Sequence, residues 1–168
     1  LIFFTATALA QTDTRIYDII QKVSAKNIEA DITTLANFGT RNTFSDTLSS
    51  TRGIGAARRW IKAEFQQISS NCTDCLEVFY QKDLVKAATS KRVPKDTWVV
   101  NVVAIQKSKT GSNRYIIISG DIDSRNSDGS DFTKDAPGAN DNASGMAGAI
   151  EAARVLSSYE FDANIVYL

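Results

Sequence analysis

The stretch Tyr115–Gly145 decides the fold, and it reads YIIISGDIDSRNSDGSDFTKDAPGANDNASG. Its first four residues, 115–118, are apolar or aromatic, which predicts a strand that is buried on both faces. Ser119–Gly120 end this run, and a polar loop follows as far as the turn at Pro137–Gly138. Residues 143–156 then predict a helix. The stretch therefore has the order strand, loop, helix.

Three aspartates occupy the two ends of this loop. Asp121 and Asp123 follow the strand two residues apart, so that in an extended chain their side chains point to the same side. Asp141 lies where the predicted helix begins. Ligands of open α/β sheets bind at the carboxyl ends of the strands, and carboxylates hold hard or borderline metal ions. One such aspartate is as typical of a turn or a cap, but the three together predict a metal site.

The remaining elements follow from periodicity and turn residues. Helices are predicted at 12–25, 27–37 and 53–68, strands at 76–81, 98–105 and 164–168, and loops at 40–51 and 82–96. The chain thus has strands and helices in an order that fits one α/β domain. We expect a mixed, mostly parallel sheet that is flanked by helices.

Two motifs, 119–125 and 136–145, resemble the first half of the metal site of the M28 zinc peptidases. The segments 35–41 and 52–61 are also similar to segments of that family, and the resemblance covers about residues 28–168. It implies the zinc-exopeptidase or aminopeptidase-like fold. It also implies an aminopeptidase that acts on peptide substrates through a water activated by two zinc ions, with manganese or cobalt as alternative metals.

The resemblance also implies roles for single residues. Asp141 corresponds to the carboxylate that bridges the two metals, and Asp121 stands where the family usually has a histidine ligand. Asp123, Asn142 and Arg125 are expected to surround these ligands without binding the metal. The family further implies a cis peptide bond between Asp141 and Asn142. Since a carboxylate replaces the neutral ligand, we expect the proximity of Asp121 to Asp123 to raise the pKa of one of them.

The chain has no histidine at all, so two other hypotheses stay open. One is a non-catalytic peptide-binding or receptor-like member with the same fold, and the other is an enzyme similar to the glutaminyl cyclases. In the family the general base and the other ligands come later, so we expect them beyond Leu168. The chain is therefore expected to be truncated at its C-terminus and to be inactive alone.

Composition and the first residues bear on location. The 168 residues carry a net charge of zero, so nothing points to nucleic acid as a partner. Residues 1–10 are apolar and end in small residues, which is typical of the back half of a signal peptide with cleavage before Gln11; an apolar first strand or helix is the alternative. We expect a secreted or periplasmic protein that does not bind membranes after cleavage. Residues 11–168 would then form the N-terminal part of a single peptidase domain.

The helix predicted at 53–68 is rich in basic residues. A site for polyanions is one interpretation, but we favour a solvated helix face that is paired with local acids. The residues concerned are Arg52, Arg58, Arg59 and Lys62.

Cys72 and Cys75 are the only cysteines of the chain. A metal site would need further histidine or cysteine ligands nearby, and a redox centre would need a thioredoxin-like setting. A local disulfide in an exported protein is the interpretation that remains.

Overall fold

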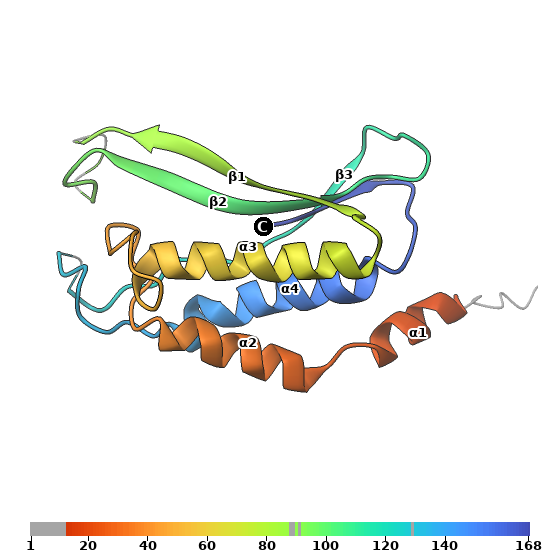
Figure 1. Ribbon diagram of the computed structural model, residues 1–168, viewed down its shortest axis with the longest axis horizontal. Coiled ribbons are helices and arrows are strands. Elements are labelled where there is room, and N and C mark those ends of the chain that lie inside the picture. The colour runs from red at the N-terminus through yellow and green to blue at the C-terminus, as the bar shows by residue number, and fades with distance from the viewer. Residues whose placement is uncertain (1–12, 88–89, 91, 129) are drawn as a thin grey trace, which may run out of the picture.

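The computed structural model describes residues 13–87, 90, 92–128 and 130–168, so the predicted signal segment 1–10 lies outside the described residues. Four α-helices are described, with a short π-helical turn before the last of them (Figure 1). The helical elements are α1 (Thr14–Gln21), α2 (Ala25–Asn37), α3 (Gly53–Asn71), η1 (Ala139–Ala143) and α4 (Ser144–Leu156). The strands are β1 (Leu76–Val85), β2 (Thr97–Gln106), β3 (Tyr115–Ile118) and β4 (Asn164–Tyr167).

The four strands form one mixed sheet in the order β1-β2-β4-β3. β1 and β2 form an antiparallel hairpin, and β2 also pairs with β4 in the antiparallel sense. β3 and β4 are parallel because α4 makes the crossover between them. The mixed sheet is confirmed, but in the described part of the chain only one of the three pairings is parallel, so the sheet is not mostly parallel there.

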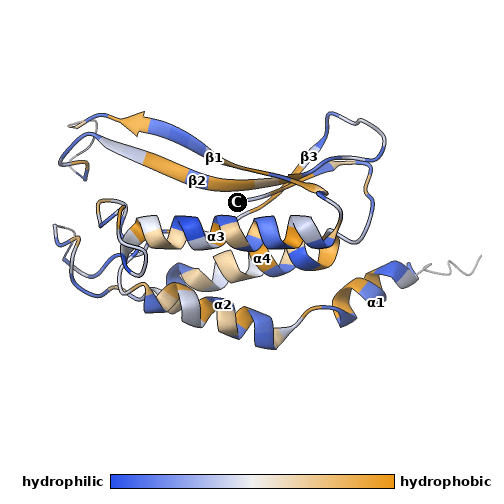
Figure 2. Cartoon of the chain, in the orientation of Figure 1, coloured by the Kyte–Doolittle hydropathy of each residue, from blue (hydrophilic) through white to orange (hydrophobic). Residues whose placement is uncertain are grey.

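Helices cover one face of the described sheet in two layers. Figure 1 shows α3 and α4 below the strands and α2 below α4. Phe65 of α3 is fully buried, and its ring centroid lies 6.4 Å from that of Tyr167 in β4. Each large side chain buried in this way contributes about 1.5–3 kcal/mol to folding. Figure 2 shows the matching pattern, because β2 is apolar over most of its length while α2 and α3 alternate between polar and apolar residues.

The first strand is longer than predicted. Residues 82–85, which were assigned to a loop, continue β1 and pair with 97–100 of β2. Leu84 and Val85 favour extended chain, and cross-strand pairs such as Leu84 with Trp98 stabilise the hairpin. The charged residues Lys82 and Asp83 made this segment look like a loop in the sequence. An exposed hairpin, however, tolerates lysine and aspartate on its solvent side.

The prediction that residues 115–118 are buried on both faces is wrong for the described structure. Tyr115, Ile116 and Ile117 are 61%, 54% and 62% exposed. β3 is the edge strand of the described sheet and pairs only with β4. Apolar content predicted the strand correctly, but it does not reveal which position the strand takes in the sheet.

The two cysteines form the predicted disulfide. Cys72 and Cys75 are joined, with their Cα atoms 5.5 Å apart, and they connect the end of α3 to the start of β1. Among the described helices, none combines the length and the apolar content that crossing a membrane requires.

Candidate metal centre

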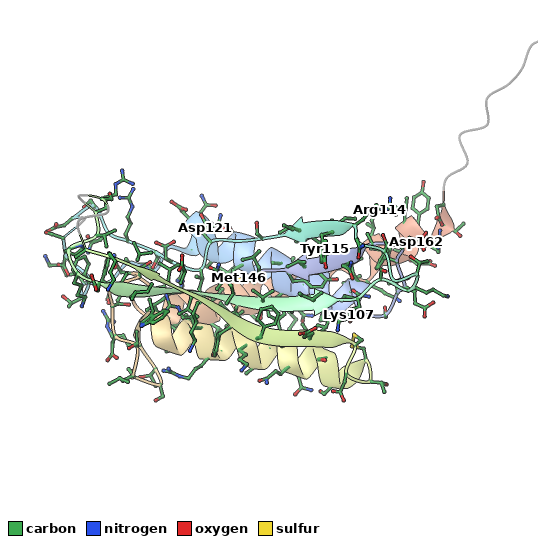
Figure 3. All side chains as sticks on the ribbon, turned by 90° about the horizontal axis from the view of Figure 1, so that it is seen from above. Lys107, Arg114, Tyr115, Asp121, Met146 and Asp162 are labelled. Carbon is green, nitrogen blue, oxygen red and sulfur yellow. A yellow bond between two sulfur atoms is a disulfide. The ribbon has the colours of Figure 1, made fainter. Side chains whose placement is uncertain are left out.

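The carboxyl end of β3 lies directly against the start of α4. A Cβ atom on Gly120 would lie 2.6 Å from the carbonyl oxygen of Gly145 and would overlap the backbone nitrogen of Met146. Only glycine permits so close an approach. Asp121 follows at once, beyond the end of β3 that is opposite to Tyr115 (Figure 3). The sequence prediction that a strand end meets a helix start is therefore confirmed.

The segment that carries Asp141 runs beside the segment that carries Asp123. Gly138 has a φ of +50°, and a Cβ atom there would lie 2.6 Å from both Cβ of Ser124 and the carbonyl oxygen of Asp141. The peptide bond between Asp141 and Asn142 is cis, as the family resemblance implied. The side chain of Asn142 folds back over the first turn of α4. The two aspartate-bearing segments thus meet at one edge of the molecule.

Arg41 joins these two segments from inside the protein. Its side chain is fully buried. Nε donates to the carbonyl oxygen of Ile122 at 2.9 Å, and Nη2 donates to that of Gly138 at 3.0 Å. Nη1 donates to the carbonyl oxygens of Pro137 at 2.7 Å and Leu35 at 2.8 Å. One guanidinium therefore holds the loop after β3, the turn before Asp141 and the end of α2.

Ser124 closes the same arrangement with its hydroxyl. Its Oγ accepts a hydrogen bond from the backbone N–H of Arg41 at 2.9 Å and donates one to the carbonyl oxygen of Ala136 at 2.6 Å. Sequence reasoning missed the role of both residues. The local sequence pattern around Arg41 gives no sign that the residue is buried. The one signal available was that Arg41 lies in a segment that resembles the family.

Asp121 and Asp123 line one cavity of about 310 Å³. Loss of solvation is the largest cause that raises the pKa of Asp123, although part of the residue remains exposed, and the charge of Asp121 raises this pKa further. The charges of Arg41 and Arg125 act in the opposite direction. The expectation that one carboxyl of this pair has a raised pKa is confirmed.

The basic residues of α3 do not share one environment. Arg52 forms an exposed ion pair with Asp135 at 2.6 Å, and Lys62 lies 4.6 Å from the centre of the Tyr80 ring. Arg58 is only 8% exposed, and its Nε is buried without a hydrogen-bond partner. Burial lowers the pKa of Arg58, while the groups of Tyr80 and Asp123 act to raise it. The interpretation of a solvated face is therefore wrong for Arg58, which points inward because the helix turns it toward the sheet.

The carboxylates of Asp121 and Asp141 fit a divalent metal by their chemistry. Both residues are exposed, so a metal can reach them. An ionised carboxylate is an acceptor only, and its oxygens are suitable metal ligands. The described residues contain no group of three or more histidine, cysteine, aspartate or glutamate side chains that could hold a metal ion. Within the described part of the chain, these two aspartates alone do not make a complete ligand set.

Comparison with known proteins places these features in a family. Residues 101–168 match the model of Peptidase family M28. A protein of Leptosphaeria maculans named "Probable zinc metalloprotease" is 44% identical over 139 residues, which are 83% of this chain and 32% of that protein. A protein of Pyrenophora teres with the same name is 40% identical over 154 residues, which are 92% of this chain and 32% of that protein. The chain spans about a third of the length of these curated relatives.

Solved structures share the fold at low sequence identity. The LapA aminopeptidase of Legionella pneumophila has a TM-score of 0.66 and 18% identity, and the match covers 98% of this chain and 39% of that one. A glutaminyl cyclase of Fimbriiglobus ruber has a TM-score of 0.64 and 16% identity, with 86% of this chain and 44% of that one covered. These likenesses concern the fold alone and agree with the predicted aminopeptidase-like fold. The match of residues 101–168 to the family model, together with curated relatives that are 44% and 40% identical over 83% and 92% of this chain, supports membership of peptidase family M28.

Proposed function

We propose that the full-length protein containing this chain is a zinc-dependent exopeptidase that removes amino-terminal residues from peptides. The observation that carries the proposal is the close contact of Gly120 with Gly145 and Met146. It brings Asp121, at the end of a strand, to the helix start that follows Asp141. The names of the curated relatives support zinc and peptide substrates.

In this proposal Asp121 and Asp141 are metal ligands. Two divalent ions held there would supply a water with a pKa lowered toward ~7 and positive charge beside the reacting carbonyl group. Asp141 has two acceptor oxygens, so one side chain can contact both ions. Asp123 and Arg125 adjust the local charge, and the side chain of Asn142 lies against Gly145 in the first turn of α4. The general base comes from outside the 168 residues.

The test compares the full-length protein with two aspartate variants. Asp141→Asn should lower the zinc content measured by plasma mass spectrometry and abolish hydrolysis of leucine nitroanilide. Asp135→Asn is the matched control, because Asp135 lies in the same loop but pairs with Arg52; it should keep both properties. Chelation by EDTA should remove activity and added zinc should restore it.

Three results would contradict the proposal. Full zinc content and full activity in Asp141→Asn would exclude Asp141 as a ligand. Loss of ammonia from peptides that begin with glutamine, without hydrolysis of other peptides, would instead support a glutaminyl cyclase. Peptide binding without turnover, in a protein that lacks zinc, would support a non-catalytic binding domain.

We also propose that the protein is exported and that its mature chain begins near Gln11. The apolar residues 1–10 and the Cys72–Cys75 disulfide support this. Intact-mass analysis of protein from the culture medium or periplasm should give a chain that starts near Gln11 and is two hydrogens lighter than the reduced form. Retention of residues 1–10 in that material would contradict cleavage at this point.

A further inference from the structure

Arg58 is a buried cation with no hydrogen-bond or ion-pair partner in the described structure, although the charge of Asp123, which lines the same cavity, acts to raise its pKa. It is 8% exposed, and its guanidinium forms no hydrogen bond and no ion pair with any residue that the structure describes. Arg41, the other buried arginine, donates four hydrogen bonds to carbonyl oxygens. An unpaired buried charge is costly, so a site of this kind needs an anion to complete it.

Two cavities meet at Arg58. The first, of about 310 Å³, is the one lined by Asp121 and Asp123. The second, of about 740 Å³, lies between the loop around Thr43 and the β1–β2 hairpin. Thr43, Arg58 and Val100 line both. A ligand that lies at the candidate metal centre can therefore reach the second cavity past Arg58.

The second cavity carries an excess of positive charge. It is lined by the cations Arg58, Lys82 and Lys95 and by one acid, Asp96. Asp96 already accepts hydrogen bonds at 2.8 Å from Lys86 Nζ and from the backbone N–H of Ala87. The charge of Asp96 is therefore already paired with Lys86, and the cavity keeps three cations against this one acid.

An aromatic wall completes the cavity. Trp98 lines it and is 55% exposed, and Phe44, from the loop around Thr43, also lines it. A planar guanidinium binds carboxylates through two parallel hydrogen bonds, and an exposed tryptophan offers flat apolar surface to a neighbouring side chain. Cations and aromatic surface together match a short peptide with a carboxylate better than they match an inorganic anion.

We propose that this cleft, defined by Arg58, Lys82, Lys95 and Trp98, binds a carboxylate of the peptide whose amino terminus lies at the candidate metal centre. The inference rests on the proposed function and deepens it, because it names peptides with a nearby carboxylate as the preferred substrates. The carboxylate belongs to an acidic side chain or to the carboxyl terminus of a short peptide. Both present the same chemistry to Arg58.

The experiment measures dissociation constants by calorimetry for the full-length protein, both zinc-loaded and treated with EDTA. Three dipeptide probes separate the two sources of the carboxylate. Ala-Glu-amide has only a side-chain carboxylate, Ala-Gln has only a terminal one, and Ala-Gln-amide has neither. At least one of the first two should bind about tenfold or more tightly than Ala-Gln-amide, as hydrogen bonds to a charged group predict.

Variants then assign this preference to the cleft. Arg58→Gln should abolish the preference while leaving the affinity for Ala-Gln-amide within about twofold. Lys62→Gln is the matched control, because Lys62 lies one turn further along α3 and lines neither cavity; it should keep the preference. If Arg58→Gln does not fold, the exposed Lys82→Gln and Lys95→Gln variants should each reduce the preference several-fold.

Equal binding of the three probes by the unmodified protein would overturn the inference, and would mean that a carboxylate of the protein itself pairs with Arg58. An equal loss of preference in Lys62→Gln would also overturn it, because the effect would then be one of overall charge. The measurement on EDTA-treated protein separates the two proposals. A preference that persists after EDTA treatment shows that the cleft binds the carboxylate without the metal. If the protein as isolated contains no zinc and hydrolyses no peptide but shows the preference, the proposed function fails and the cleft assignment stands.

Discussion

At the scale of single residues, Arg41 determines how the two aspartate-bearing segments are held. Its guanidinium satisfies four backbone carbonyl oxygens that belong to three separate segments. Removing a buried donor leaves these acceptors without partners, which costs about 1–3 kcal/mol for each acceptor that water cannot reach. The candidate site therefore depends on Arg41, although all four of these hydrogen bonds go to backbone atoms and none goes to a candidate metal-binding side chain.

We predict that Arg41→Met lowers the free energy of unfolding by about 3–5 kcal/mol, because methionine fills part of the volume but donates no hydrogen bond. The midpoint of unfolding in urea measures this. Arg52→Ala is the control, since its exposed ion pair with Asp135 should be worth about 1 kcal/mol or less. An equal loss in the two variants would show that Arg41 has no special role.

The second prediction at this scale concerns Asp121, which stands where the family usually has histidine. A carboxylate adds negative charge, so it should weaken the pull of a metal on its water and shift the rate profile to alkaline pH. We predict that Asp121→His in the full-length protein tightens zinc binding and moves the profile toward neutrality. Zinc affinity by competition with a chelator and hydrolysis against pH measure the two effects. No change in either would remove Asp121 from the ligand set.

At the scale of secondary-structure elements, the disulfide fixes the connection from α3 to β1. Thr73 and Asp74, between the two cysteines, both have positive φ, at 60° and 57°. Such left-handed residues cost about 1–2 kcal/mol each unless they are asparagine, aspartate or glycine. Of the two, Thr73 therefore bears this cost, and the covalent link helps to hold the turn that contains it.

We predict that replacing both cysteines with alanine lowers the free energy of unfolding by about 2 kcal/mol, which is what a closed loop of four residues gives in the chain-entropy estimate. Chemical denaturation of the double variant, beside the oxidised and reduced forms of the original chain, measures this. The variant and the reduced form should agree. A double variant as stable as the oxidised protein would show that the turn forms without the link.

At the scale of the whole molecule, three helices meet around a group of charges. Asp31 of α2 faces Glu64 of α3 and both Glu151 and Arg154 of α4. Loss of solvation, followed by the charges of Glu64 and Glu151, raises the pKa of Asp31 to about 6, whereas Arg154 acts to lower it. Glu151 is held in place by Arg154 and by the backbone N–H of Ser24, which donates to it at 2.6 Å.

This pKa predicts how stability depends on pH. The folded protein keeps the proton of Asp31 up to about pH 6, whereas the unfolded chain releases it near the ordinary value of 3.8. The folded state therefore binds more protons between these values, and the contribution of Asp31 to stability falls as pH rises from about 4 to 6. Above that window the loss is constant, at about 1–2 kcal/mol after allowance for solvent screening.

We predict that Asp31→Asn stabilises the protein by about 1 kcal/mol at pH 7.5 and by clearly less at pH 4, because folded Asp31 is then protonated and the unfolded chain is only about half ionised at this position. Urea midpoints at the two pH values measure the difference. Asp18→Asn, on the peripheral helix α1, serves as the control and should give the same small change at both. A gain of equal size at pH 4 would show that charge is not the cause.

The sequence by itself determined those features that depend on neighbouring residues. Apolar periodicity and turn residues predicted the helices and strands, and the pair at Cys72 and Cys75 predicted the disulfide. The same local signals predicted that Asp121 follows a strand and that Asp141 precedes a helix. Resemblance to a family added the cis bond after Asp141. All of these are properties of short segments, so they depend on residues that are neighbours in the sequence.

Only the tertiary structure decided which residues are buried and which strand lies at an edge. Arg41 and Arg58 are buried although their sequence neighbours gave no sign of it, whereas Tyr115 and its apolar neighbours are exposed. The physical reason is that burial depends on atoms from distant segments. Carbonyl oxygens from Leu35, Ile122 and Pro137–Gly138 make the pocket of Arg41, and they come together only when helices and sheet pack.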